Sequence, residues 1–225
     1  YRCIPDGAPW ANVYAYFTDQ RIWPRGFPLD RIHDPGAVMA EDQLKLETVR
    51  VGVWQGLADG DPDVDAIYRL TVGTACRFKP AEPVVLPPGT HSPFNSQNTL
   101  FRKALFPLLY LPALVTFRFT DILRGWVAQP IMWRAGFQLG FTRATVFQER
   151  NPHDDLQDFE SEIPGYLNAQ RVMEIAQEAV GSDVSVSDNL ARVYGALARV
   201  EIVSDDELRL LDAWLVDCQK LGCGS

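Results

Sequence analysis

A chain of 225 residues, 47% of them apolar and 22% charged, is long enough for one folded domain with a sizeable core. Its net charge of −8 argues against general nucleic-acid binding, which needs a basic face to neutralise phosphates. The longest apolar run, residues 104–117, is broken by Pro107 and Pro112 and is shorter than the roughly 20 residues of a membrane-spanning helix.

The N-terminal third is rich in aromatic residues, proline and glycine. It predicts a short strand or helix at residues 12–17, followed by a fixed loop at residues 23–29, WPRGFPL. In this loop two prolines restrict the backbone and Gly26 allows positive φ. Branched and aromatic residues at 48–57 predict a buried strand, and GDPDVDAIYRLT after it predicts a loop that enters a short helix.

The middle of the chain alternates between loops and regular elements. The proline-rich residues 77–93 predict an extended connection across the surface, and SPFNSQNTLF predicts a polar loop before a helix. Residues 113–117 predict a strand that delivers a helix capped by Thr120, and residues 141–148 predict a further strand. This alternation is typical of an α/β fold.

The rest of the chain is predicted to be mostly helical from Asp154 onward. One helix is expected to begin at Ser187 or Asp188. The last helix is expected to begin with a capping box, in which Ser204 and Glu207 satisfy each other's backbone donors.

Asp61, Asp63 and Asp65 alternate along the loop GDPDVDA. Alternating carboxylates can hold a metal ion or a ligand. They can also cap a helix N-terminus, where they complement the helix dipole, and Pro62 suits a first helical turn. The polar approach GLADG favours the cap, with Asp61 as the capping residue and with Asp63 and Asp65 as candidates for contacting a sugar.

Asp121 in FTDILRGW is predicted to lie in the first turn of a helix that follows a strand. That position suits a capping residue, and it also projects a side chain into the active-site crevice of an α/β fold. Arg124, one helical turn on, can pair with the acid or grip a phosphate. Both interpretations stay open from the residues alone.

The loop FNSQNTLF and the stretch QERNPHDD complete the candidates. Asn95 and Asn98 have the amide groups that sugar hydroxyls require, although an unliganded asparagine-rich loop is the simpler interpretation. His153 is a candidate metal ligand, and the alternative is a structural surface histidine.

Five blocks occur in the order WPRGFPLD, GDPDVDAIYRLT, PFNSQNTLF, FTDILRGWVAQ and QERNPHD. Together they resemble the glycosyltransferase domain of the STELLO proteins of plants and their relatives elsewhere. More distantly they resemble the reversibly glycosylated polypeptides, which act as UDP-arabinopyranose mutases. The resemblance spans residues 9–170.

The resemblance implies the C-terminal part of a GT-A type nucleotide-diphospho-sugar transferase fold. Residues 1–170 would form the acceptor-side half of that domain, and residues 171–225 a helical C-terminal extension. In such enzymes a metal-binding DxD motif ends a strand of the nucleotide-binding half. No block here matches that strand, so the DxD is expected upstream of Tyr1.

The resemblance also implies roles for single residues. Arg25 falls where the mutases carry an arginine that becomes glycosylated, which implies either self-glycosylation or a clamp on a diphosphate. Asp121 falls where an acid contacts the acceptor and serves as general base. Gln148 stands where the mutases have a histidine, so His153 is the candidate third metal ligand.

The sequence therefore predicts a glycosyltransferase, or part of one, that uses a nucleotide-sugar donor, a carbohydrate or glycoprotein acceptor and a divalent cation, Mn or Mg. The predicted roles are catalytic for Asp121, substrate-binding for Arg25, Asp63, Asp65, Asn95, Asn98 and Arg124, and metal-binding for His153. The alternatives are a sugar-nucleotide mutase or a non-catalytic sugar-binding or scaffolding module, with the helical tail as a surface for a protein partner. The STELLO resemblance suggests the Golgi, and the mutase resemblance suggests the cytosol.

Overall fold

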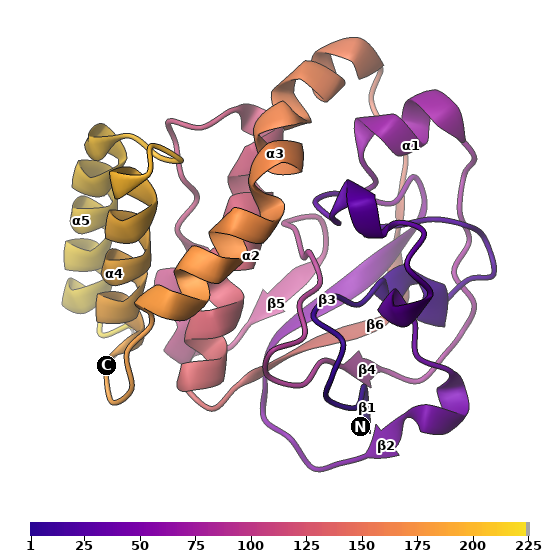
Figure 1. Ribbon diagram of the computed structural model, residues 1–225, viewed down its shortest axis with the longest axis horizontal. Coiled ribbons are helices and arrows are strands. Elements are labelled where there is room, and N and C mark those ends of the chain that lie inside the picture. Colours follow the sequence, from indigo (N-terminus) through magenta and orange to yellow (C-terminus); the bar gives the residue numbers. More distant parts are fainter. Residues whose placement is uncertain (224–225) are drawn as a thin grey trace.

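A mixed six-stranded sheet lies at the centre of the computed structural model, which describes residues 1–223 (Figure 1). The strand order is β2-β1-β4-β6-β3-β5. The strands are β1 (Arg2–Cys3), β2 (Lys45–Leu46), β3 (Val51–Gly60), β4 (Val84–Val85), β5 (Thr99–Phe101) and β6 (Gln138–Gln148). The helices are α1 (Ala66–Thr71), α2 (Thr120–Arg134), α3 (Asp155–Ala179), α4 (Val186–Arg199) and α5 (Asp205–Lys220). Short 3-10 helices cover Val13–Tyr16, Leu29–Arg31, Pro35–Ala37, Glu41–Gln43, Lys103–Leu109 and Phe117–Phe119.

The two long strands, β3 and β6, run parallel and pair from Val51 to Gly60 of β3. The first part of β3 is buried, as its branched and aromatic residues predict. Close packing fixes the pair, because a Cβ on Gly140 of β6 would lie 2.4 Å from the indole ring of Trp54. The two strands therefore form a rigid support that ends with both carboxyl termini at the same edge of the sheet.

Helices cover one side of this support (Figure 1). The residues of α2 from Ile122 to Met132 are all buried, so this helix forms the centre of the helical layer. The long helix α3 packs against α2 and α1, and α4 and α5 lie side by side at the far end of the molecule. A single main core joins the sheet, α2, α3 and the C-terminal helices.

Serine side chains begin the last two helices. Ser185 Oγ accepts a hydrogen bond from the backbone N–H of Asp188, so α4 begins before the predicted Ser187. Ser204 Oγ accepts one from Glu207 N, as predicted. Glu207 does not complete the capping box: its buried carboxylate turns inward and accepts hydrogen bonds from the loop before α2.

Several predicted elements are confirmed, and others are wrong. The strands expected at 48–57 and 141–148 correspond to β3 and β6, and the short helix after GDPDVD is α1. The strand expected at 113–117 is wrong, because this stretch is irregular and ends in a 3-10 turn. Thr120 is the first residue of α2 and does not cap it. The connection 77–93 does not stay on the surface, since it contributes the buried strand β4.

The mixed α/β architecture with a helical C-terminal part is thus confirmed, while the more specific GT-A assignment stays a prediction. The predicted division at residue 170 falls inside the continuous helix α3. In the described part of the chain, no helix combines the length and apolar character needed to cross a membrane.

Candidate functional site

The candidate site lies where β3 and β6 end. Gly60 pairs with Gln148, so the loops that follow the two parallel strands leave the sheet side by side. The first loop carries the acids of GDPDVDA, and the second carries Arg150 and His153. Ligands of open α/β sheets bind outside the carboxyl ends of such strands.

A cavity of about 250 Å³ opens at this edge, and we call it the Arg25 cavity. It is lined by Arg25, Asp61, Pro62, Asp63, Arg69, Gln97, Arg118, Asp121, Gln148, Arg150 and His153. Four residues predicted from the sequence therefore come together here: Arg25, Asp63, Asp121 and His153. They come from four separate segments of the chain, so only the fold makes them neighbours.

The guanidinium of Arg25 joins the two central acids. Its Nε and Nη2 donate to the two carboxylate oxygens of Asp63, each at 2.8 Å, and Nη2 also lies 2.9 Å from Asp121 Oδ1. Nη1 donates to the backbone carbonyl of Arg118. Arg25 is 7% exposed, and its contacts form the bidentate fork that a planar guanidinium makes with a carboxylate. A side chain held in this way orients its neighbours; self-glycosylation of Arg25 and a clamp on a diphosphate both stay predictions.

The loop that carries Arg25 is rigid for a local reason. Gly26 has a φ of +85°, which glycine adopts without strain, and a Cβ there would lie 2.4 Å from a methyl carbon of Ile122. The backbone N–H of Arg25 also donates to the carbonyl of Asp63 at 3.0 Å. The predicted fixed loop is confirmed, and it is attached to both α2 and the acidic loop.

Arg25 and Asp63 stabilise each other's charged form. Burial alone would raise the pKa of Asp63, but the charge and hydrogen bonds of Arg25, together with the charges of Arg118 and Arg69, lower that pKa below its ordinary value. Burial alone would lower the pKa of Arg25, and the charges of Asp63 and Asp121 raise it above its ordinary value. Both groups therefore stay charged at the wall of the cavity.

The other arginines of the cavity are also paired with carboxylates. Arg69 Nη1 lies 2.5 Å from Asp61 Oδ1, so Asp61 forms an ion pair and is not the predicted helix cap. Arg118 Nη2 lies 2.7 Å from Glu162 Oε1 on α3. Arg150 contacts the carboxylates of two further acids on α3, Asp155 at 2.8 Å and Asp158. The cavity wall thus consists of charge pairs, which offer many hydrogen-bonding atoms and little net charge.

Asp65 lies outside the cavity and is fully buried. One of its carboxylate oxygens caps α1 by accepting from Tyr68 N at 2.7 Å, and the other accepts from Trp23 Nε1 at 2.6 Å. Burial, reinforced by the charges of Glu162 and Asp63, raises the pKa of Asp65 to about 6 against the opposing effect of these hydrogen bonds. The helix-cap interpretation of GDPDVDA is therefore confirmed, with Asp65 as the capping residue.

The side chains of Asn95 and Asn98 form hydrogen bonds that hold the loop before β5. Asn95 Oδ1 accepts from Gln97 N at 2.9 Å, and Asn98 Nδ2 donates to Thr145 Oγ1 on β6 at 2.7 Å. Neither side chain lines the Arg25 cavity. They instead fix the loop from which Gln97 reaches the cavity.

Arg124 lies beneath the same loop, buried beside the ring of Phe94 at 5.2 Å. Its Nη2 donates to Ser96 Oγ at 3.0 Å, and Ser96 N donates to Asp121 Oδ2 at 2.9 Å. Burial lowers the pKa of Arg124 to about 10. Arg124 therefore supports Asp121 through Ser96 and does not itself reach the cavity.

The side chains of the cavity do not fit a divalent cation. Within residues 1–223, no group of three or more His, Cys, Asp and Glu residues is placed to hold a metal ion. His153 Nδ1 lies 3.3 Å from Asp158 Oδ2, which also accepts from Arg150. The carboxylates of Asp63 and Asp121 are bonded to Arg25. The metal role of His153 stays a prediction without a ligand set in this part of the chain.

Four members of the cavity wall were not predicted from the sequence: Arg69, Gln97, Arg118 and Arg150. A signal was present for the arginines, because each stands within one of the quoted sequence blocks or directly beside it. Their pairing across four segments could not be read from spacing.

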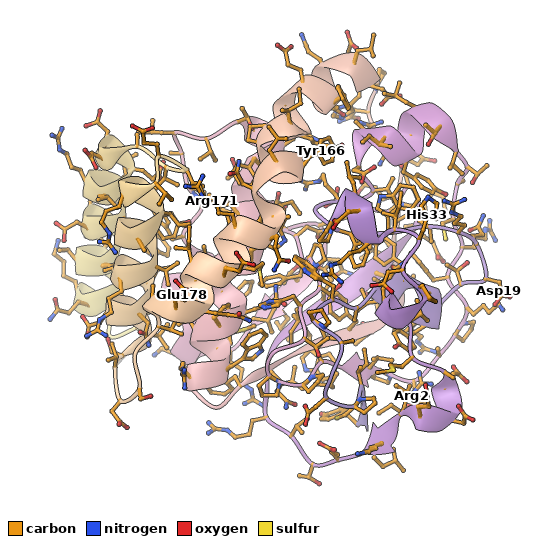
Figure 2. The ribbon with its side chains drawn as sticks, in the orientation of Figure 1. Arg2, Asp19, His33, Tyr166, Arg171 and Glu178 are labelled. Carbon is orange, nitrogen blue, oxygen red and sulfur yellow. The ribbon has the colours of Figure 1, made fainter. Side chains whose placement is uncertain are left out.

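Glu162 and Tyr166, both on α3, connect this helix to the cavity and to α1. Glu162 Oε2 accepts from Tyr166 OH at 2.5 Å and from Ala66 N, the first residue of α1, at 2.8 Å. Tyr166 lies on α3 close to α1 (Figure 2). Glu162 therefore links Arg118 at the cavity to the start of α1 and to α3.

Comparison with known proteins finds a family and two relatives that this chain resembles. The family model of the STELLO glycosyltransferases matches residues 118–224, which include α2, β6 and the C-terminal helices. Two proteins of Arabidopsis thaliana, probable glycosyltransferase STELLO1 and probable glycosyltransferase STELLO2, are 28% and 27% identical to the chain over 218 residues. That alignment covers 94% of this chain and 28% of the length of each relative.

The matched region of the family model contains Arg118, Asp121, Arg150 and His153, and the alignment with the two relatives extends over most of the remaining chain. The more distant resemblance to the mutases stays a prediction. The resemblance that the five sequence blocks carry is therefore confirmed: the chain is similar to the STELLO glycosyltransferases.

Proposed function

We propose that this chain forms the acceptor-side part of a glycosyltransferase, which moves a sugar from a nucleotide-sugar donor to a hydroxyl group of a carbohydrate acceptor. The relationship to the STELLO glycosyltransferases supports the reaction class. The observation that carries the proposal is the position of Asp121, a carboxylate fixed from two sides at the wall of a cavity at the carboxyl edge of the sheet.

In this proposal Asp121 orients the acceptor. Each of its oxygens accepts one hydrogen bond, from Arg25 or from Ser96 N, and a carboxylate has lone pairs left for a further donor. An acceptor hydroxyl that donates to Asp121 is held ready for reaction. Asp121 takes the proton as the hydroxyl oxygen bonds to the anomeric carbon of the donor and the nucleoside diphosphate leaves.

The remaining wall suits a neutral, hydroxyl-rich ligand. Because each arginine of the cavity is paired with a carboxylate, its charge is already compensated, so the cavity is a poor site for a diphosphate. Sugar hydroxyls both donate and accept, and the amides of Gln97 and Gln148 meet them on the same wall. We therefore propose that Arg25 and Asp63 determine the shape of the acceptor site. Asp65, Asn95, Asn98 and Arg124 hold in place the loops that surround it.

A cation would assist a nucleotide sugar by neutralising the departing diphosphate. The described residues of this chain do not fit one, so no step is assigned to it here. The divalent cation and the DxD motif upstream of Tyr1 both stay predictions.

A sugar-binding module without catalytic activity is the second candidate. Its support is that both central acids are bonded to Arg25, which holds them in place without a role in catalysis. Such a module would use the same cavity to hold a sugar and would not turn over a donor.

A donor screen with the full-length protein tests the proposal. Wild type, Asp121→Asn and Asp42→Asn, an exposed acid away from the site, are incubated with a panel of nucleotide sugars and manganese, and released nucleotide is measured with and without acceptor glycans. Asp121→Asn is expected to lose transfer by about 10²–10⁴-fold while its circular dichroism stays that of wild type, as does the transfer rate of Asp42→Asn. Full transfer by Asp121→Asn would remove Asp121 from the mechanism, and glycan binding without donor turnover by wild type would establish the module instead.

A further inference from the structure

A second cavity adjoins the Arg25 cavity, and we call it the Phe147 cavity. It measures about 450 Å³. It is lined by Gly60, Asp61, Pro62, Val64, Tyr68, Arg69, Gly73, Thr74, Ala75, Phe147, Gln148, Glu149 and Arg150. The two cavities have a common wall of Asp61, Pro62, Arg69, Gln148 and Arg150. They therefore form two compartments of one depression along the carboxyl edge of the sheet.

The volumes of the two cavities suit a ligand that occupies both. Sites for small organic ligands measure about 300–1,000 Å³. The Arg25 cavity, at about 250 Å³, lies below this range, while the Phe147 cavity, at about 450 Å³, lies within it. A ligand that reaches Asp121 in the smaller compartment would enter the larger one if it extended past their shared wall.

Phe147 gives the larger compartment an aromatic surface. This residue is 61% exposed near the end of β6, where the strand has left the core. Its ring lies against Gly60, where a Cβ would come within 2.8 Å of a ring carbon. Because Gly60 has no side chain and a φ of +85°, the ring can rest on the backbone with much of its surface free. An exposed aromatic ring beside a polar cavity is a surface on which the apolar C–H face of a pyranose can pack.

The polar groups of the compartment suit a neutral ligand. Arg69 is paired with Asp61, and Arg150 with Asp155 and Asp158. Glu149 adds a further acid to the lining. A phosphate would therefore meet compensated cations and neighbouring carboxylates, whereas sugar hydroxyls can donate to the acids and accept from the arginines.

We propose that the Phe147 cavity is a subsite for a second sugar unit, so that the acceptor is a neutral oligosaccharide of at least two units, with its reacting end at Asp121 and its next unit on the ring of Phe147. This rests on the proposed function in that Asp121 marks the reacting end. It goes further in assigning the class of acceptor and the residue that selects for chain length. A nucleobase could also stack on an aromatic ring, and the experiment separates the two.

Binding of neutral oligosaccharides is measured on the full-length protein, for wild type, Phe147→Ala and Val146→Ala. Val146 is also partly exposed on β6, points to the opposite face of the strand and lines neither cavity, so it is the matched control. The probes are glycan series of one to six units in several linkages, together with UDP. For at least one series, wild type and Val146→Ala are expected to bind the two-unit glycan about tenfold more tightly than the one-unit glycan, and Phe147→Ala is expected to lose this gain.

Three results would overturn the proposal: no binding of any glycan by wild type, equal affinity for all chain lengths, or a loss in Phe147→Ala that affects UDP and not the glycans. Donor turnover is recorded on the same samples. Turnover without length-dependent glycan binding refutes the subsite and leaves the glycosyltransferase intact. Length-dependent binding through Phe147 without turnover supports the subsite and refutes the enzyme.

Discussion

Different buried partners give two acids of the GDPDVDA loop opposite pKa shifts. Asp63 faces Arg25 and has a lowered pKa, whereas Asp65 accepts from the neutral donors Tyr68 N and Trp23 Nε1 and has a pKa raised to about 6. Sequence spacing cannot separate these cases, because the two carboxylates differ in which buried partners the fold brings to them. The presence of a helix start was predictable from the acids, but Pro62 lies before the capping residue Asp65 and not, as predicted, in the first turn.

The raised pKa of Asp65 predicts a pH-dependent loss of stability. The folded state holds the proton more tightly than the unfolded chain, so this group contributes stability below about pH 4 that disappears as the pH rises through 6. Asp65→Asn keeps a capping oxygen and cannot titrate. The free energy of unfolding of wild type, relative to that of Asp65→Asn, should fall by about 2 kcal/mol between pH 4 and pH 7. Denaturant unfolding across this range measures the difference, and a constant difference would show that Asp65 titrates normally.

Among the elements, α2 and the loop of residues 94–98 are in close contact. Gly125 lies directly under the loop, and a Cβ there would be 2.4 Å from the carbonyl oxygen of Phe94. The loop carries Ser96, whose backbone N–H holds Asp121, and Gln97, which lines the Arg25 cavity. The close contact thus connects the packing of α2 to the shape of the candidate site.

Two glycine-to-alanine changes should therefore have opposite effects. Gly125→Ala is expected to lower the free energy of unfolding by about 1–3 kcal/mol, because the loop must move. Gly195 lies inside α4 in open space, where an added Cβ would have no neighbouring atom within 4 Å, so Gly195→Ala should raise stability by about 0.5–1 kcal/mol. Thermal and denaturant unfolding of both variants compare the effects. A stable Gly125→Ala would mean that the loop is not held by this contact.

The elements that could be predicted are those with a strong local pattern. The branched residues of β3, the helices after residue 154 and the Ser204 cap are properties of short stretches. The strand expected at 113–117 was wrong because the segment is irregular and largely exposed, and the backbone N–H groups of Ala113 and Leu114 bond to the distant carboxylate of Glu207. A partner 93 or 94 residues away in the chain leaves no local signal.

At the scale of the whole molecule, Glu207 joins the C-terminal helices to the rest of the core. Its fully buried carboxylate accepts from Ala113 N at 3.0 Å, from Leu114 N at 2.7 Å and from the hydroxyl of Tyr110. These partners lie apart from the Arg25 cavity, whose lining lies on other segments. The helical pair α4–α5 is thus attached through a buried polar network.

Removal of this carboxylate should weaken the attachment. Glu207→Ala removes the acceptor of the backbone N–H groups of Ala113 and Leu114 and the side-chain partner of the buried Tyr110 hydroxyl, and it is expected to lower the free energy of unfolding by about 3 kcal/mol. Ser204→Ala removes only the cap of the same helix and should cost about 1 kcal/mol. Equal costs for the two variants would mean that the network does not hold α5. Hydrogen exchange of α5 amides offers an independent readout of the same difference.

The site could be predicted only in part. Arg25, Asp63, Asp121 and His153 were found from their sequence blocks, and the fold brings them to one cavity. Their contacts could not be predicted, because each depends on segments that are separated by tens of residues. Arg25 proved to be the group that holds the two acids, and Arg124 and the asparagines proved to support the loop beside it.

The central claim is that the Arg25 cavity, held in shape by the bidentate contact of Arg25, is where transfer takes place. The rate of sugar transfer by full-length Arg25→Lys tests it most directly, since lysine keeps the charge and loses the planar fork. Arg102→Lys, which changes an exposed arginine outside the cavity, is the control. We predict that kcat falls about 10²-fold in Arg25→Lys, because Asp121 loses its fixed position, and stays near wild type in Arg102→Lys. Wild-type kcat in a folded Arg25→Lys variant would contradict the account.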